Sequence, residues 1–187
     1  KVADEIVLTN STSGIVNTSG VINEPTSGGG RTITWDDLLS AEGAGEDDAD
    51  TSNSKWYMRK ETYYRLVQTK SGGSGEYLWN SFLPNPNSPT TPWGTPIVFT
   101  RVLPKSTEVG SNGAMAVYGD LSNYILYNKK GMDLTILKEA TIVDANSQSF
   151  NLATQDGTAM RAVVRLLGKL PKGNAGKFVI LGTGTVS

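Results

Sequence analysis

The sequence predicts an α+β fold in which β-structure dominates, and three observations lead to this prediction. Gly, Ser, Thr and Asn make up more than a third of the 187 residues, a composition typical of short strands joined by turns. Short apolar segments alternate with turn-forming residues along the chain, and no long amphipathic helix pattern occurs. The length suffices for one domain, or for one and a fraction, with its own hydrophobic core.

The clearest helix signal follows a threonine. Thr34 is a good N-cap, and Asp36 and Asp37 place negative charge in the first turn, where the helix dipole favours it. This helix should be short and should end near Gly43. Residues 42–54 are small and acidic, and we expect them to form a solvated loop.

The rest of the chain predicts one more short helix, at residues 61–67, and a series of strands. Residues 160–167 alternate apolar side chains with Arg161 and Arg165, which is the period of a strand with one buried face. Residues 84–96 contain five prolines and predict an extended loop. The predicted strands are residues 56–58, 97–102, 115–118, 124–127, 134–137, 141–143, 160–167 and 178–181, the last lying in a sheet centre.

The sequence has no Cys and no His, which excludes several kinds of chemistry. Disulfides, thiolate nucleophiles, Ser-His-Asp triads and metal sites built on Cys or His cannot form. The S-x-x-K pattern at residues 52–55 lacks the S-D-N and K-T-G elements that its chemistry requires. The acidic loop does not have the EF-hand spacing. We therefore expect no enzyme activity, no cofactor and no metal.

Charge is nearly balanced overall but unevenly divided along the chain. The net charge of −1 gives no general case for binding nucleic acid or an anionic membrane, and no apolar run is long enough to span a membrane. Residues 1–60 carry ten acidic and five basic residues, whereas residues 61–187 carry eight acidic and twelve basic ones. This division would help copies of the chain to associate head to tail.

The division also suggests which side chains lie between copies. Arg161 and Arg165 share one face of the predicted strand, either as a solvent-facing row or as a charge strip that meets acidic groups of another copy. The candidates for contacts between copies are Arg161, Arg165 and Lys169 on the basic side, and Glu46, Asp47 and Asp48 on the acidic side.

Aromatic residues are dense in the middle of the chain and allow two interpretations. They form the core of a small α+β domain, or they line a platform for sugars or bases, as in a β-rich carbohydrate-binding module. A third hypothesis is a hydrolase with two carboxylates about 5–10 Å apart in a cleft, drawn from Asp36, Asp37, Asp120 and Asp133. The aromatic residues are Trp56, Tyr57, Tyr63, Tyr64, Tyr77, Trp79 and Trp93.

The order of several segments resembles the major capsid proteins of tailed bacteriophages. Residues 118–126 read Tyr-Gly-Asp-Leu-Ser-Asn-Tyr-Ile-Leu and are similar to a signature of that family, as are residues 129–132, Lys-Lys-Gly-Met. The other similar segments are residues 56–59 followed by a short helix, residues 75–79, residues 93–98, residues 157–165 and residues 177–181. The resemblance covers residues 56–182.

The resemblance implies the Hong Kong 97 type of capsid fold, with an axial domain and a peripheral domain. Residues 1–128, with a strand at 174–182 returning to them, would form the axial domain as a mixed β-sheet with short helices. Residues 129–173 would form the long β-hairpin of the peripheral domain. The family's N-terminal arm, extended loop and spine helix would lie upstream of Lys1, so we expect a fragment that does not assemble into shells by itself.

The implied function is structural. The protein would be a shell-forming subunit of a tailed phage or prophage, located in the virion and assembled in the bacterial cytoplasm. Its partners would be copies of itself in hexamers and pentamers, with packaged DNA met only indirectly and with no membrane or small-molecule substrate. The alternatives are an encapsulin-type nanocompartment shell and, from another class, a β-rich carbohydrate-binding module.

Overall fold

A computed structural model describes residues 5, 7–9, 14–27, 31–46, 51–68, 89–110, 113–143, 145–152, 154 and 157–183. The chain divides into two compact units. The sheet unit contains Lys1–Ile125 and Gly168–Ser187, and the ribbon unit contains Leu126–Leu167. Each unit is described by itself. None of the described helices has the length and apolar character needed to cross a membrane.

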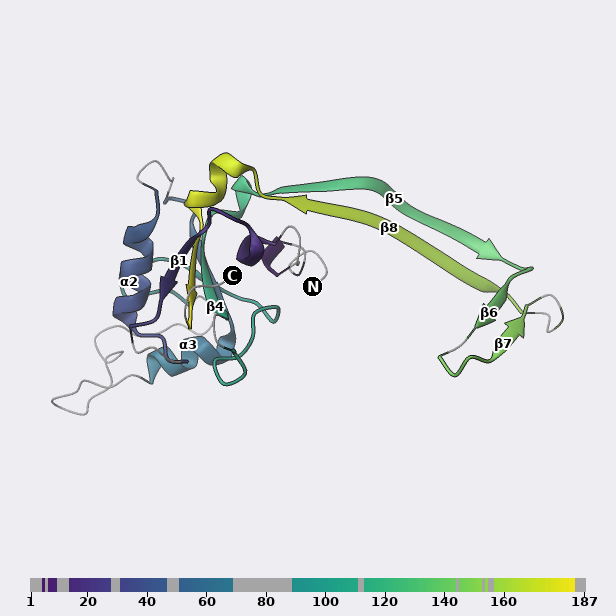
Figure 1. The fold of residues 1–187 in the computed structure, drawn as a ribbon, viewed down its shortest axis with the longest axis horizontal. Coiled ribbons are helices and arrows are strands. Elements are labelled where there is room, and N and C mark those ends of the chain that lie inside the picture. The colour runs from purple at the N-terminus through teal and green to yellow at the C-terminus, as the bar shows by residue number, and fades with distance from the viewer. Residues whose placement is uncertain are drawn as a thin grey trace. The chain divides into compact units, whose positions relative to one another are not determined.

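A mixed five-stranded sheet organises the sheet unit (Figure 1). The two outer pairs, β1 with β9 and β2 with β3, are parallel, and β4 runs antiparallel to its neighbours β9 and β2. The prediction of an α+β fold with a mixed sheet and short helices is confirmed. In spatial order the strands are β1 (Ile22–Pro25), β9 (Val179–Gly182), β4 (Ala114–Gly119), β2 (Lys55–Met58) and β3 (Ile97–Phe99).

Two α-helices belong to the same unit, α2 (Trp35–Ala44) and α3 (Lys60–Val67). Helix α2 begins with a capping box: Asp37 N donates to Thr34 Oγ1 at 3.2 Å, and Thr34 N donates to Asp37 Oδ2 at 2.8 Å. This confirms the predicted N-cap. Short 3-10 turns are η1 (Ile15–Asn17), η3 (Leu121–Asn123) and η4 (Lys172–Lys177).

Both faces of the sheet are covered, so its strands alternate between two cores. Trp56 and Met58 of β2 enter the cluster that also contains Leu38 of α2 and Leu66 of α3. Tyr57, between them in sequence, enters the opposite cluster with Val117, Phe178 and Ile180. All residues of β4 and β9 are buried, which fits central strands with apolar contacts on both sides.

Close packing at the end of β4 explains the glycine of the Tyr-Gly-Asp-Leu-Ser segment. Gly119 has a φ of +145°, and a Cβ atom there would lie 2.5 Å from Phe178 Cδ1. The next residue, Asp120, caps η3 by accepting from Ser122 N at 2.9 Å and from Ser122 Oγ at 2.6 Å. The segment therefore combines a close approach that only glycine allows with a local cap that reverses the chain.

The ribbon unit is built from two long strands and a small terminal hairpin. Strand β5 (Ile125–Leu137) lies beside β8 (Ala159–Lys169), and Figure 1 shows that they run in opposite directions. Strands β6 (Thr141–Val143) and β7 (Ser149–Asn151) pair antiparallel. At roughly 3.4 Å per residue, β5 is about 40 Å long.

Several predictions for individual elements were wrong. Residues 124–127 and 134–137 were predicted as two strands, but residues 125–127 and 134–137 belong to one strand, β5, and Tyr124 precedes it. Residues 160–167 do form a strand, but its apolar face is not buried: Met160 is 68% exposed. A two-stranded ribbon has no further layer of its own to cover that face, as far as the described residues show.

Other differences concern loops and strand ends. Residue 42 belongs to α2, so the predicted solvated loop begins later. Strand β3 ends at Phe99 because the chain turns after Thr100, whose N–H donates to Met58 O at 2.9 Å. The described part of the proline-rich segment, residues 89–96, folds back on itself: Thr91 N donates to Thr95 O at 2.8 Å. Strands β1 and β7 were not predicted, and residues 84–88 lie outside the described residues.

Candidate intersubunit surfaces

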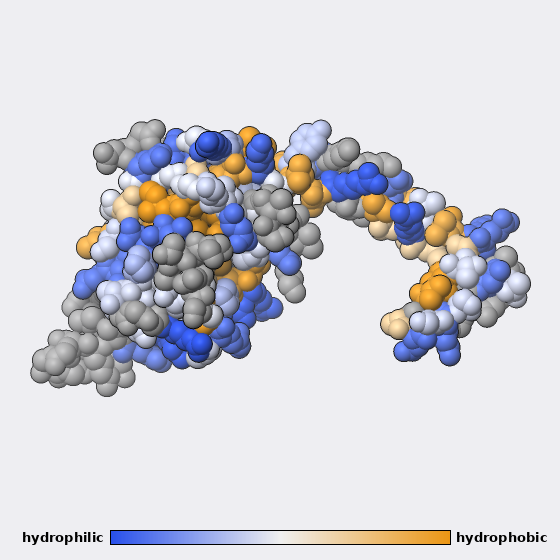
Figure 2. Space-filling view, in the orientation of Figure 1, coloured by the Kyte–Doolittle hydropathy of each residue, from blue (hydrophilic) through white to orange (hydrophobic). Residues whose placement is uncertain are grey.

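The ribbon unit exposes many of its large apolar side chains. No residue of Leu126–Leu167 whose burial is described is buried, whereas 27 hydrophobic residues are buried in the described part of the sheet unit. Figure 2 shows hydrophobic and hydrophilic side chains interspersed along this ribbon. Large, exposed apolar residues of the unit are Leu126, Tyr127, Leu134, Ile136, Ile142, Val143, Met160 and Leu167. Such a surface is typical of a segment that is covered by another chain.

A basic hollow lies on one face of the ribbon. Arg161, Val163 and Arg165 of β8 line it together with Asp133 and Thr135 of β5, and its volume is about 160 Å³. Arg161 and Arg165 therefore face the same space, as the two-residue period predicts. Asp133 supplies one carboxylate from the same chain, which leaves the hollow with one positive charge in excess.

The other candidate contact residues differ in their surroundings. Lys169 is exposed at the end of β8. Glu46 follows α2, and its N–H donates to Gly176 O at 3.3 Å. Its carboxylate lies so close over Gly176 that a Cβ atom there would overlap it, so Glu46 contacts its own chain. Asp47 and Asp48 lie outside the described residues.

Glu42 connects α2, β2 and the loop before β3 through hydrogen bonds. The sequence analysis had instead placed this residue in a solvated loop. Trp56 Nε1 donates to its Oε1 at 2.6 Å. Trp93 Nε1 and Thr95 Oγ1 donate to its Oε2 at 2.9 and 3.2 Å. One carboxylate of α2 thus fixes β2 and the loop before β3. No local pattern in the sequence marks this role, because the three donors come from positions 56, 93 and 95.

Most of the described aromatic side chains belong to the core. Trp56 and Tyr63 are fully buried, and Tyr57 is nearly so. Tyr64 and Trp93 are partly exposed, but they do not line one common hollow. This arrangement agrees with a core role and gives no flat aromatic platform among the described residues. Tyr77 and Trp79 lie outside them.

The four aspartates of the hydrolase hypothesis lie in three separate parts of the fold, with the exposed Asp36 next to Asp37 in the first turn of α2. Asp37 caps α2, and hydrogen bonds from Ser27 and Thr34 hold its pKa below the usual value although burial opposes this. Asp120 caps η3, and Asp133 belongs to the ribbon unit. Among the described residues, no group of three or more acidic side chains is placed to hold a metal ion.

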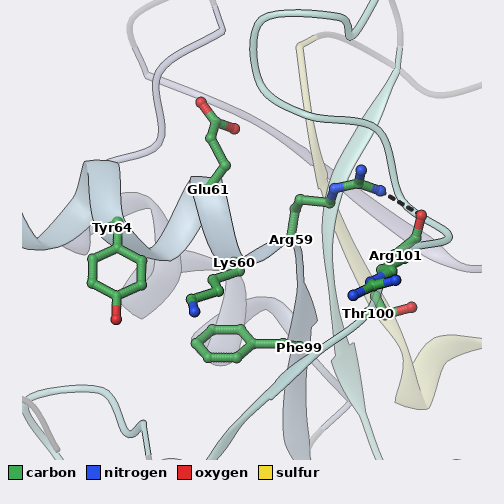
Figure 3. A pocket seen from close by; sticks show the side chains of 7 residues that line it. All are labelled: Arg59, Lys60, Glu61, Tyr64, Phe99, Thr100 and Arg101. Carbon is green, nitrogen blue, oxygen red and sulfur yellow. Dashed lines mark hydrogen bonds between the residues drawn. The ribbon is translucent and has the colours of Figure 1, made fainter. Parts of the chain in front are cut away.

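A larger hollow lies where two parallel strands end (Figure 3). It has a volume of about 530 Å³. Arg59 and Lys60 follow β2, and Phe99, Thr100 and Arg101 come at or directly after the end of β3. Because Met58 pairs with Phe99 in the parallel β2–β3 ladder, these two chain segments arrive side by side. Tyr64 and Glu61 of α3 complete the lining.

The charges around this hollow do not cancel. Arg59 donates to two backbone oxygens, those of Arg101 and Leu103, which carry no negative charge to balance the guanidinium. Lys60 Nζ lies 5.6 Å from the centre of the Tyr64 ring, and in Figure 3 its side chain extends between that ring and Phe99. Arg101 is exposed. Within the described part of the chain, no carboxylate forms an ion pair with any of these cations.

Glu61, the one acidic residue among the described residues of this lining, already has partners in its own chain. It accepts from Ser106 N at 3.0 Å and from Ser106 Oγ at 2.8 Å, and it pairs with Arg65 at 2.5 Å. These contacts outweigh partial burial and hold the pKa of Glu61 below its usual value. In Figure 3 its carboxylate extends away from Lys60 and Phe99. The sequence analysis did not identify this hollow.

Comparison with known proteins gives one family and a set of similar folds. The chain matches the Phage capsid family over residues 2–179. A structure from Gordonia phage Cozz aligns with a TM-score of 0.64 at 14% identity, covering 97% of this chain and 58% of that chain. The capsid of an empty GTA particle aligns with a TM-score of 0.59 at 14% identity, covering 96% and 60%.

A structure from Microbacterium phage Oxtober96 aligns with a TM-score of 0.57 at 20% identity, covering 83% of this chain and 52% of that chain. At such identities the likeness concerns the fold. This chain therefore spans between half and two thirds of the length of the proteins it resembles. No curated protein sequence matches it.

Proposed function

Because the chain belongs to the phage capsid family, whose members it also resembles in fold, we propose that it is a structural, shell-forming subunit that assembles with copies of itself. The shell would be the head of a tailed phage or prophage, with subunits in hexamers and pentamers and assembly in the host cytoplasm. The encapsulin and carbohydrate-binding alternatives receive no support from the comparisons.

The single observation that carries the proposal is the ribbon unit. Its 42 residues contain no buried described residue, and eight of its large apolar side chains are exposed. A two-stranded ribbon is at best marginally stable in water unless its apolar surface is covered. Copies of the same chain, repeated by the symmetry of a shell, provide a regular source of such a cover.

The two units suggest how the family's domains map onto this chain. We assign the sheet unit to the axial domain and the ribbon unit to the β-hairpin of the peripheral domain. The sequence prediction put the hairpin at residues 129–173, and the ribbon unit comprises Leu126–Leu167. Strand β9 supports the return of the chain to the axial domain, because it pairs with β1 and β4 inside the sheet.

The chemistry of the chain agrees with a passive role. Of the carboxylates in the hydrolase hypothesis, Asp37 and Asp120 serve as helix caps, and Asp133 lies in the other unit. A shell protein instead requires strict contacts repeated between copies, for which many weak interactions suffice.

Electron microscopy of the gene product that contains these 187 residues tests the proposal. Closed particles of uniform diameter, formed without other phage proteins, are the expected result. A product that stays monomeric in sedimentation velocity at every concentration tested, and forms no particle, would contradict it.

A further inference from the structure

We propose that the hollow at the ends of β2 and β3 binds the acidic segment 46–50 of a second copy of this chain. The inference rests on the proposed function, because it concerns a contact between shell subunits. It adds to that function a named pair of surfaces. The cationic side belongs to Arg59, Lys60 and Arg101, and the acidic side reads Glu-Asp-Asp-Ala-Asp.

The hollow is suited to carboxylates. Three cations line it, and its acidic residue, Glu61, is paired with Arg65 and bonded to Ser106. Positive charge in excess is costly to cover unless the covering surface is negative. The rings of Tyr64 and Phe99 add an apolar wall against which the stem of an acidic side chain can pack.

The described residues that flank the acidic segment, Glu46 and Thr51, lie at the opposite ends of the strands from the hollow, so we assign the segment to the hollow of another copy. Glu46 is held against Gly176, just before β9, and Thr51 is close to the start of β2. Both places are at the amino ends of parallel strands. The hollow lies at the carboxyl ends of β2 and β3, about 13 Å further along a four-residue strand.

This geometry defines the symmetry of the contact. A negative surface at one edge and a positive surface at the opposite edge make a heterologous, head-to-tail contact, and such contacts generate rings when the rotation closes. Rings are what hexamers and pentamers of a shell require.

Two complementary variants test the proposal. The first, Lys60→Glu with Arg101→Glu, reverses the hollow. Both side chains are exposed, and a glutamate in the first turn of α3 is favoured by the helix dipole, so this variant should fold. The second, Asp47→Lys with Asp48→Lys and Asp50→Lys, reverses the segment and leaves Glu46 in place.

The measurement is carbodiimide cross-linking of a mixture of isotope-labelled and unlabelled chains, followed by mass spectrometry. In the unmodified protein, we expect cross-links between chains that join Lys60 to residues 46–50. Each variant alone should lose association between chains by about tenfold or more, because like charges then face each other. An equal mixture of the two variants should regain it, which a misfolded variant could not do.

Three results would overturn the inference. One is the absence of cross-links between chains at Lys60, and another is a mixture that associates no better than its components. The third is that the first variant keeps its association but loses binding of a single-stranded DNA oligonucleotide, which would make the hollow a site for phosphates. If the gene product forms particles while the mixture fails, only this inference falls, and the proposed function stands.

Discussion

The sheet unit and the ribbon unit differ in how far their apolar side chains are buried. In the sheet unit, β4 and β9 are buried over their full lengths, and a cluster of apolar residues covers each face of the sheet. Strands β5 and β8, of 13 and 11 residues, lie side by side, and within the ribbon unit none of their residues whose burial is described is buried. The same kinds of residue, Ile, Leu, Val and Met, thus serve two purposes.

The difference separates stability from recognition. Burial of an apolar side chain contributes about 1.5–3 kcal/mol to the free energy of folding, so the sheet unit can account for most of the stability of an isolated chain. The exposed side chains of the ribbon contribute little until another surface covers them. Substitutions in the two units should therefore have different consequences, and the following predictions run from the largest expected effect on stability to the smallest.

Removing a buried aromatic ring from the sheet unit should have the largest effect on the free energy of unfolding. Trp56 is fully buried, its ring centre lies 5.1 Å from that of Tyr118, and its indole N–H is bonded to Glu42. We expect Trp56→Ala to lower the free energy of unfolding by about 3–5 kcal/mol, because it leaves a large cavity. Urea denaturation measures this.

The matched variant in the ribbon is Ile136→Ala. Ile136 is 59% exposed, so its truncation should change the free energy of unfolding by less than about 0.5 kcal/mol. A loss as large as that of Trp56→Ala would show that the ribbon is covered within the chain itself. The proposed difference between a buried sheet unit and an exposed ribbon unit would then be wrong.

The carboxylate of Glu42 allows the same comparison for a polar group. Glu42→Gln keeps the shape of the side chain but replaces one accepting oxygen by an amide that donates, so at least one donor among Trp56, Trp93 and Thr95 loses its partner. The expected loss is about 1.5–3 kcal/mol in the free energy of unfolding. Glu139→Gln, at an exposed position in the ribbon unit, is the control and should be neutral.

How much of this could be read from the sequence depends on the range of the interactions. The capping box at Thr34 is local, and so is the alternation that places Arg161 and Arg165 on one face; both were predicted. Strand β1 was missed because Asn23 and Pro25 are poor strand formers, and only its pairing with β9 makes it a strand.

Two further errors have the same physical origin. Separate strands were predicted at residues 124–127 and 134–137, yet a ribbon without a core tolerates the polar and glycine residues between them inside β5. The hollow near Arg59 and Arg101 depends on the parallel pairing of β2 with β3, which are far apart in sequence. No local pattern could have brought those residues together.

A backbone constraint in the sheet unit gives a smaller effect. Gly119→Ala would place a Cβ atom 2.5 Å from Phe178 Cδ1 and 2.9 Å from Lys177 O, at a φ of +145°. We expect a loss of about 1–3 kcal/mol in the free energy of unfolding. Gly43→Ala in α2, where nothing lies within 4 Å, should instead stabilise the protein by about 0.5–1 kcal/mol. If both substitutions destabilised equally, close packing at Gly119 would not be the cause.

Reversing the basic face of the ribbon should have the smallest effect on stability and a large one on assembly. Arg161 and Arg165 are exposed, so Arg161→Glu with Arg165→Glu should change the free energy of unfolding by less than about 0.5 kcal/mol. If this face meets acidic groups of another copy, the yield of particles from the full gene product should fall sharply, because like charges would oppose each other. Lys138→Glu, an exposed change outside the hollow, is the control. Equal particle yields for all three proteins would leave Arg161 and Arg165 as a solvent-facing row, and the recognition role of the ribbon would then rest on its apolar side chains alone.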